Sequence, residues 1–283
     1  MEGARLNLAN NPSFSFFHGN QSPPYYFPEN QIITSRGLLA ISKSDPKAGK
    51  TIATAIMRAH TMLDNAVTIL SERDNELYAY PVDNLLRVFT GDGRRPITAT
   101  GEGVLEHLRD KAYSVNPARI VGFEQPGRGN VSAYVMNGDV GRGIYINMSG
   151  PALKNTEAQA VNFIHEWAHQ YLDARDHWYI NKKEIYEHQH GRSAFFVSLE
   201  MKALVHEGLS ERQVKEIPQG YASKSMFVSA FNKDAGVQQQ SMMNNADNIA
   251  LLVYTLNHEY ERFNPPPQSS FLGRFRSWIS GLL

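Results

Sequence analysis

The chain contains no cysteine and no excess of either charge. Without cysteine it has no disulfides and no thiolate ligands for a metal ion. Its 28 Lys and Arg residues balance 28 Asp and Glu residues, so the composition gives no reason to expect a basic face for nucleic acid. No stretch approaches the roughly 18 apolar residues of a membrane span, and no secretory signal peptide is evident. These absences predict a soluble protein that binds no nucleic acid, and we expect a monomer.

One pattern with chemical meaning is present, within residues 161–179. His165 and His169 are four residues apart, so on a helix both imidazoles lie on one face and can bind one metal ion. Glu166 can take a proton from water at the open coordination position of such an ion. A chance H-E-x-x-H is expected only roughly a few hundredths of a time in such a chain. Apolar residues at helical spacing support a helix here: Phe163, Ile164, Ala168, Tyr171 and Leu172.

A catalytic zinc site needs a third protein ligand. A glutamate on a later helix is one option, and three residues qualify by type: Glu184, Glu187 and Glu200. An aspartate shortly after the helix is the other option, which Asp173 and Asp176 satisfy. If the helix continues, Asp173 lies one turn beyond His169 and too far from His165 to share its ion. Asp176 is therefore the preferred third ligand.

The residues after the helix resemble a known family. Asp176-His177-Trp178-Tyr179 matches the Asp-x-x-Tyr part of the motif of the deuterolysin-type aspzincins, which include the fungal lysine-specific metallo-endopeptidases. Gly143-Ile-Tyr-Ile-Asn-Met and Asn245-Ala-Asp-Asn are also similar to stretches of this family. The resemblance implies that Asp176 binds zinc and that the Tyr179 hydroxyl stabilises the oxyanion of the tetrahedral intermediate. It also implies that Asp247 lines the pocket for the residue after the scissile bond.

Three positions depart from the family pattern, which has Gly, Thr and Gly there: Asp173, Ala174 and Ile180. Without glycine, we expect the turn that returns Asp176 to the metal to use ordinary backbone angles. Asp173, His177 and Glu187 therefore stay open as alternative third ligands. Ala250 stands where the lysine-specific members have a glutamate, so we expect only a loose preference for a basic residue after the scissile bond. The secreted fungal relatives carry disulfides, and their absence here favours a reducing compartment or a passage through one.

The chain divides into three parts by composition. Residues 1–44 are rich in Asn, Ser, Pro and aromatics and are interpreted as an irregular leader. Leaders of this kind without a signal peptide occur on effectors that bacteria export into host cells, and a loop wrapped on the domain is the alternative. Residues 45–263 form the predicted catalytic domain, with an insertion at about 181–240. Residues 264–283 are a Pro-rich linker and an amphipathic segment, whose part 269–283 could weakly contact a membrane or a partner, or dock on its own domain.

The periodicity of the apolar residues predicts the elements of the domain. We expect helices at 46–72 and 103–113 and from Asn244 or Asn245 to Asn264, short strands at 119–124, 131–136 and 143–148, and a mixed region with a short strand at 78–90. An edge strand beside the metal helix could hold an extended peptide by backbone pairing, and 131–136 is the candidate.

The sequence thus predicts an α+β, zincin-like fold with a small antiparallel or mixed sheet packed on the H-E-x-x-H helix and helices elsewhere. The predicted function is a Zn²⁺-dependent endopeptidase that cuts protein or peptide substrates. Two alternatives stay open: a metal hydrolase acting on a non-peptide bond, and a binding or effector module that keeps the fold without turnover.

Overall fold

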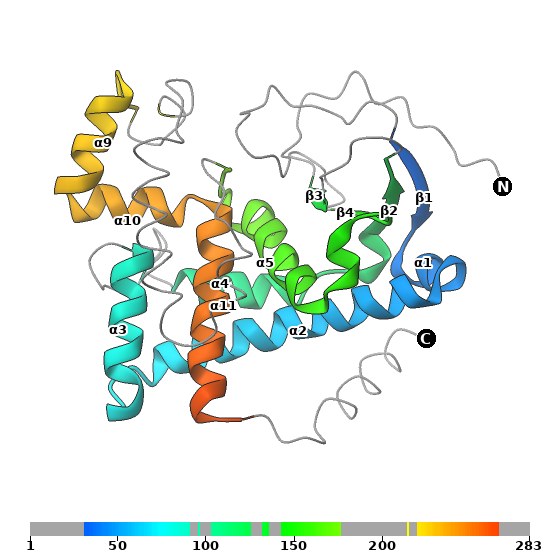
Figure 1. Ribbon diagram of the computed structural model, residues 1–283, viewed down its shortest axis with the longest axis horizontal. Coiled ribbons are helices and arrows are strands. Elements are labelled where there is room, and N and C mark those ends of the chain that lie inside the picture. Colours follow the sequence, from blue (N-terminus) through cyan, green and yellow to red (C-terminus); the bar gives the residue numbers. More distant parts are fainter. Residues whose placement is uncertain are drawn as a thin grey trace.

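The computed structural model describes residues 31–90, 96, 103–125, 132–135, 143–176, 214 and 220–265. Helices dominate this part of the chain, and a small sheet lies at one end of the long helix α2 (Figure 1). The helices are α1 (Leu38–Ser44), α2 (Pro46–Ser71), α3 (Glu76–Thr90), α4 (Val104–Ala112), α5 (Thr156–Leu172), α9 (Lys224–Lys233), α10 (Ala235–Met243) and α11 (Ala246–Phe263). Short 3₁₀ turns, η1 (Pro117–Arg119) and η2 (Pro151–Lys154), precede the strand at Ile120–Glu124 and α5. The fold class is therefore α+β, as predicted.

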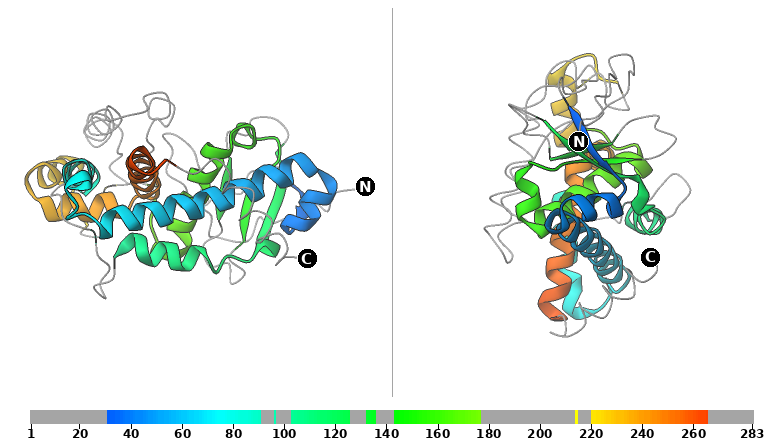
Figure 2. Two further views of the ribbon diagram at one scale, coloured as in Figure 1. Left: turned by 90° about the horizontal axis from the view of Figure 1, so that it is seen from below. Right: turned by 90° about the vertical axis from the view of Figure 1, so that its right-hand side faces the viewer.

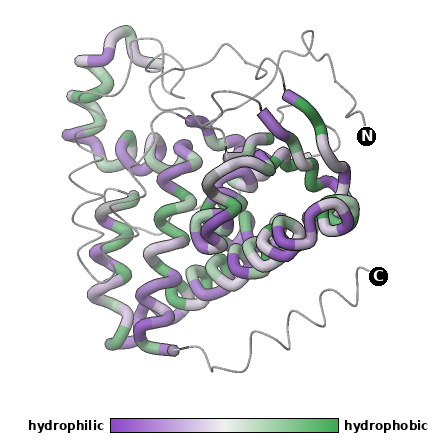
Figure 3. Tube along the Cα trace, turned by 45° about the vertical axis from the view of Figure 1, so that its right-hand side comes forward, coloured by the Kyte–Doolittle hydropathy of each residue, from purple (hydrophilic) through white to green (hydrophobic). Residues whose placement is uncertain are grey.

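Helix α2 is the element against which α5 and α11 both pack. It begins where the sequence predicts: Asp45 accepts a hydrogen bond from the Ala48 amide at 2.9 Å, and Pro46 occupies the first helical position. Apolar and hydrophilic residues alternate along α2 (Figure 3), and the buried residues of this helix are apolar, whereas α11 is buried throughout residues 246–257. Figure 2 shows α2 extending along most of the described part of the molecule.

An ion-pair network joins the same three helices. Arg58 of α2 donates to both carboxylate oxygens of Glu157 on α5, at 2.9 and 2.7 Å, and also pairs with Glu261 on α11. The Arg58 side chain is only 18% exposed, so water screens these pairs weakly. The network fixes α5 and α11 relative to α2, and these are the two helices that carry the site described below.

The sheet is mixed and has the order β1-β2-β4-β3, from strands β1 (Ile32–Arg36), β2 (Ile120–Glu124), β4 (Ile144–Asn147) and β3 (Ala133–Val135). β2 and β4 are parallel, and the outer strands are antiparallel to their neighbours. One face contributes to the main core with the helices, while the other carries a smaller apolar cluster: Ile33, Val121, Phe123, Tyr134 and Tyr145. Within the described sheet β3 is an edge strand, as predicted.

Local patterns predicted most elements correctly, including α2, α4, α11 and the three strands from β2 to β4. Two predictions are wrong. Residues 31–44 do not belong to an irregular leader, because they form β1, which pairs with β2, and α1, which packs on α2. Residues 78–90 hold no strand, because α3 covers them despite Pro81. No helix in the described part of the chain is long and apolar enough to cross a membrane.

Candidate metal centre

Helix α5 carries both histidines of the motif inside the protein. Asn155 caps the helix by accepting hydrogen bonds from the amides of Glu157 and Ala158. His165 is 0% exposed and His169 is 6% exposed, and their Nε2 atoms lie 2.9 Å apart. The four-residue spacing thus brings two imidazole nitrogens to one point, as predicted from the sequence.

The other ring nitrogen of each histidine has an acceptor that fixes the tautomer. His165 Nδ1 donates to the Asp247 carboxylate at 2.8 Å, and His169 Nδ1 donates to the Ala174 carbonyl at 2.7 Å. Because these oxygens accept, each neutral ring carries its hydrogen on Nδ1, which leaves Nε2 as the atom that can bind a proton or a metal ion. Two lone pairs at such a distance repel unless a proton or a cation lies between them.

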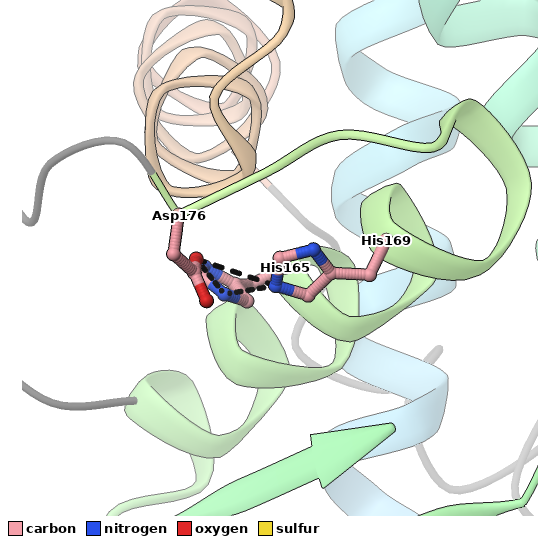
Figure 4. Close-up of side chains that lie close together, drawn as sticks. All are labelled: His165, His169 and Asp176. Carbon is pink, nitrogen blue, oxygen red and sulfur yellow. Dashed lines mark hydrogen bonds and ion pairs between the residues drawn. The ribbon is translucent and has the colours of Figure 1, made fainter. Parts of the chain in front are cut away.

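The chain reverses after α5 and brings Asp176 back to the histidines (Figure 4). Asp173 ends the helix in the left-handed conformation, with φ 52° and ψ 29°. The expectation of ordinary backbone angles in this turn is therefore wrong: an aspartate adopts the angles that favour glycine, which Asp tolerates better than most residues. Asp176 Oδ1 then lies 3.1 Å from His165 Nε2 and 3.3 Å from His169 Nε2.

Backbone pairing with α11 holds this return loop in place. The Arg175 amide donates to the Asn244 carbonyl at 2.8 Å, and the Ala246 amide donates to the Arg175 carbonyl at 3.0 Å. These bonds form a parallel bridge between Arg175 and Asn245 at the start of α11. The position of Asp176 thus depends on a segment that is distant in sequence.

The donor set fits a metal ion. Metal–nitrogen and metal–oxygen bonds of about 2.0–2.1 Å in tetrahedral geometry place ligand atoms roughly 3.3 Å apart, close to the three distances observed. Two neutral nitrogens and a carboxylate oxygen are also a suitable ligand set for a divalent transition metal. His165, His169 and Asp176 therefore form a group that could hold a metal ion.

The charge around this group also favours a cation. The Asp176 side chain is 10% exposed, and the nearby Glu166 and Asp247 are 1% and 0% exposed. No Lys or Arg is among the buried residues of the described ranges. Burying carboxylates close together is costly, and a divalent ion between the ligands would offset that cost.

The pKa values of the metal-free group show how strongly its members interact. Burial alone would lower the pKa of His169, but the charges of Asp176 and Glu166 and its hydrogen bonds raise it to about 9. Burial would raise the pKa of Asp176, but the two histidines hold it well below its usual range. A proton on His169 therefore supplies part of the missing positive charge in the metal-free protein.

The structure brings some of the predicted site residues together and leaves others apart. His165, His169 and Asp176 converge, and the Glu166 carboxylate is close enough to act on the pKa of His169. The side chain of Asp173 is 80% exposed and pairs with Arg175, so it is not a ligand here. Four other candidates and Tyr179 lie outside the described residues: His177, Glu184, Glu187 and Glu200.

Asp247 lies behind His165, where it is 0% exposed and accepts a hydrogen bond from the ring of that histidine. Its role as a lining residue of a substrate pocket stays a prediction. Sequence reasoning missed this contact because the residues that it joins lie on α5 and α11, and no local spacing relates them.

Comparisons of the chain with protein-family models, with curated proteins and with solved structures give no match. Fold and site together define an α+β protein with a buried His-His-Asp group that could hold a metal ion. Any more specific function must be argued from the chemistry of that group.

Proposed function

We propose that the protein is a zinc-dependent endopeptidase in which His165, His169 and Asp176 hold the ion and Glu166 is the general base. The convergence of the three donor atoms beside a buried glutamate carries the proposal. Two histidines and one carboxylate are a ligand set of catalytic zinc sites, which leave the fourth position open. Zinc held there would polarise a substrate carbonyl and lower the pKa of water to about 7.

The residues of the chain then have separate tasks. Asp176 and the two histidines orient the ion, while the hydrogen bonds at both Nδ1 atoms keep each Nε2 directed at it. Glu166 takes a proton from the attacking water and passes it to the leaving amine. Tyr179 is the proposed hydroxyl for the oxyanion, on the strength of the sequence resemblance. The proposed substrate is an extended peptide, which β3 could pair with at the edge of the sheet.

Replacing the proposed base tests this function. Glu166→Gln should retain the fold and the zinc, because the glutamate is not a ligand, and should lose about 10²–10⁴-fold in the rate of peptide hydrolysis. Casein cleavage followed by mass spectrometry of the fragments measures the rate and the cut sites, and metal analysis measures bound zinc. Glu72→Gln is the matched control, since it makes the same substitution at an exposed residue at the end of α2, outside the site.

The outcomes separate the proposal from its rivals. A Glu166→Gln variant that cuts casein at the wild-type rate contradicts the mechanism. Wild-type protein that holds zinc but leaves casein and peptide libraries uncut indicates a hydrolase of another bond. Protein that binds no zinc under any loading condition indicates a fold that is retained for binding alone.

A further inference from the structure

We infer that Asp247 is a positioning residue of the metal centre, acting on His165 through its Nδ1 atom. The inference rests on the metal site of the proposed function and is independent of the bond that the enzyme cuts. Asp247 makes no contribution to the ligand group itself, whose atoms come from His165, His169 and Asp176. Its role is to hold one ligand in the orientation and tautomer that the ion requires.

The contact between Asp247 and His165 is buried and short. Oδ1 of Asp247 lies 2.8 Å from His165 Nδ1, and the two side chains are 1% and 0% exposed. Water therefore does not compete for this hydrogen bond, and the ring of His165 cannot rotate without breaking it. With the hydrogen fixed on Nδ1, Nε2 is the only nitrogen of His165 that can bind a metal ion.

The position of Asp247 in α11 suits a buried carboxylate. It lies in the first turn of the helix, where the backbone dipole favours negative charge. A carboxylate behind a ligating histidine makes the imidazole more basic and strengthens its bond to the metal. The start of α11 thus offers both a place that tolerates the charge and a direct contact to the ligand.

The same turn of α11 also positions Asp176. The backbone of Arg175 is bonded to Asn244 and Ala246 on either side of the helix start. Asp247 follows directly after Ala246, so one short segment orients a ligand on α5 and anchors the loop that delivers the third ligand. Metal affinity should therefore depend on Asp247 more strongly than on its buried neighbours in α11.

The neighbour Asn248 provides a matched control. It is 0% exposed in the same helical turn, and its amide donates to the carbonyls of Phe89 and Met242, each at 3.0 Å. Asn248→Ala should lower the stability of the fold, because it leaves those carbonyls without this donor. Asn248→Ala should change zinc affinity by less than about threefold, since neither Phe89 nor Met242 belongs to the ligand group.

The experiment compares Asp247→Asn, Asp247→Ala and Asn248→Ala in the full chain. Zinc dissociation constants come from competition with a chromophoric chelator, and urea unfolding reports stability. Asp247→Ala should weaken zinc binding by about 10- to 100-fold. Asp247→Asn should weaken it less, because an amide oxygen still accepts from His165 Nδ1. The visible spectrum of the Co²⁺-loaded protein should change in both Asp247 variants and stay unchanged in Asn248→Ala.

Two results would overturn the inference. One is a folded Asp247→Ala variant that binds zinc as tightly as wild type. This result would count against the inference even if the variant had a raised KM for substrates with a basic residue, because such a change would point to substrate binding. The other is equal loss of affinity in Asn248→Ala. If Asp247→Ala fails to fold, Asp247→Asn decides by the same two measurements. Wild-type protein without zinc affinity would refute the proposed function itself, which distinguishes the two failures.

Discussion

In the proposed metal centre, a proton and the metal ion would compete for the same atom of His169. Its Nδ1 hydrogen is engaged by the Ala174 carbonyl, so the proton that titrates is the one on Nε2. Burial alone would lower the pKa of this imidazole, but Asp176 and Glu166 raise it to about 9. Metal-free protein near neutral pH therefore carries a proton at the position that a metal ion must occupy.

Zinc binding at pH 6 should consequently release about one proton from His169. This pH lies below the pKa of about 7 expected for water on the ion, so the ligand accounts for the proton. Below pH 7, the apparent zinc affinity should rise about tenfold per pH unit, because each bound ion displaces one proton from His169. Calorimetric titration in buffers of different ionisation enthalpy counts the protons. Binding at pH 6 with no proton release would show that the His169 pKa does not govern the site.

At the scale of elements, the turn after α5 determines whether a third ligand reaches the metal. Asp173 holds a positive φ of 52°, where a glycine would fit without strain. Its carboxylate contributes little, because it is 80% exposed in a surface pair with Arg175. The backbone angle, and not the charge, is the property of Asp173 that the site requires.

Substitutions at Asp173 should therefore follow backbone preference. Asp173→Gly and Asp173→Asn should keep zinc affinity and change stability by no more than about 1 kcal/mol, whereas Asp173→Val should lose about 1–2 kcal/mol because a β-branched residue resists the left-handed region. The Val variant should also bind zinc more weakly, since Asp176 is displaced. Urea unfolding and chelator competition provide the measurements. Full zinc affinity in Asp173→Val would mean that Asp176 is placed by the α11 pairing alone.

Elements with a clear local signal were predictable from the sequence. The cap at Asp45 and Pro46 and the apolar stripe behind it sufficed for α2, and short runs of β-branched and aromatic residues between Gly-rich turns sufficed for β2, β3 and β4. Helix α3 was missed although its buried residues have helical spacing: Tyr78, Val82, Leu85, Leu86 and Phe89. Pro81 and the aromatic residues masked that period. β1 was missed because it is short and its stability comes from pairing with β2.

The residues of the candidate site also differ in how far the sequence predicts them. His165, Glu166 and His169 follow from spacing on one helix, which a sequence shows directly. Asp176 could be nominated by type and resemblance, but its return depends on backbone bonds between Arg175 and the start of α11. The contact of Asp247 with His165 also crosses between helices. Long-range pairings of this kind leave no periodic trace in the chain.

At the scale of the whole molecule, the metal group joins three segments: helix α5, the loop after it and the start of α11. Arg58 connects α5 and α11 to α2 at a separate place, through Glu157 and Glu261. The ligand group lies beside the buried side chains of Glu166 and Asp247, and the pKa of His169 is raised to about 9 by Asp176 and Glu166 although burial alone would lower it. Loss of a metal ion from this group should therefore lower the free energy of unfolding of the whole protein.

Chelation should lower the melting temperature, and zinc should restore it. With free zinc at 100 times its dissociation constant, binding contributes about 2.7 kcal/mol, or roughly 5–10 °C for a chain of this size. Differential scanning calorimetry with and without a chelator measures the shift. His165→Ala should abolish the zinc-dependent shift, whereas His60→Ala should keep it, because His60 stacks on Trp167 outside the ligand group.

The pH dependence of the chelated protein provides a second, independent signature of the same charges. The folded pKa of His169, about 9, lies above the ordinary histidine value of 6.5. The folded state therefore binds the proton more tightly than the unfolded state, and this contribution is fully present below pH 6.5 and is lost as the pH rises through about 9. Chelated wild-type protein should thus unfold at lower urea concentration at pH 9.5 than at pH 6.5.

Zinc-loaded protein should not show this loss of stability, because the ion replaces the proton. Equal pH profiles with and without zinc would show that the buried carboxylates are compensated by other groups.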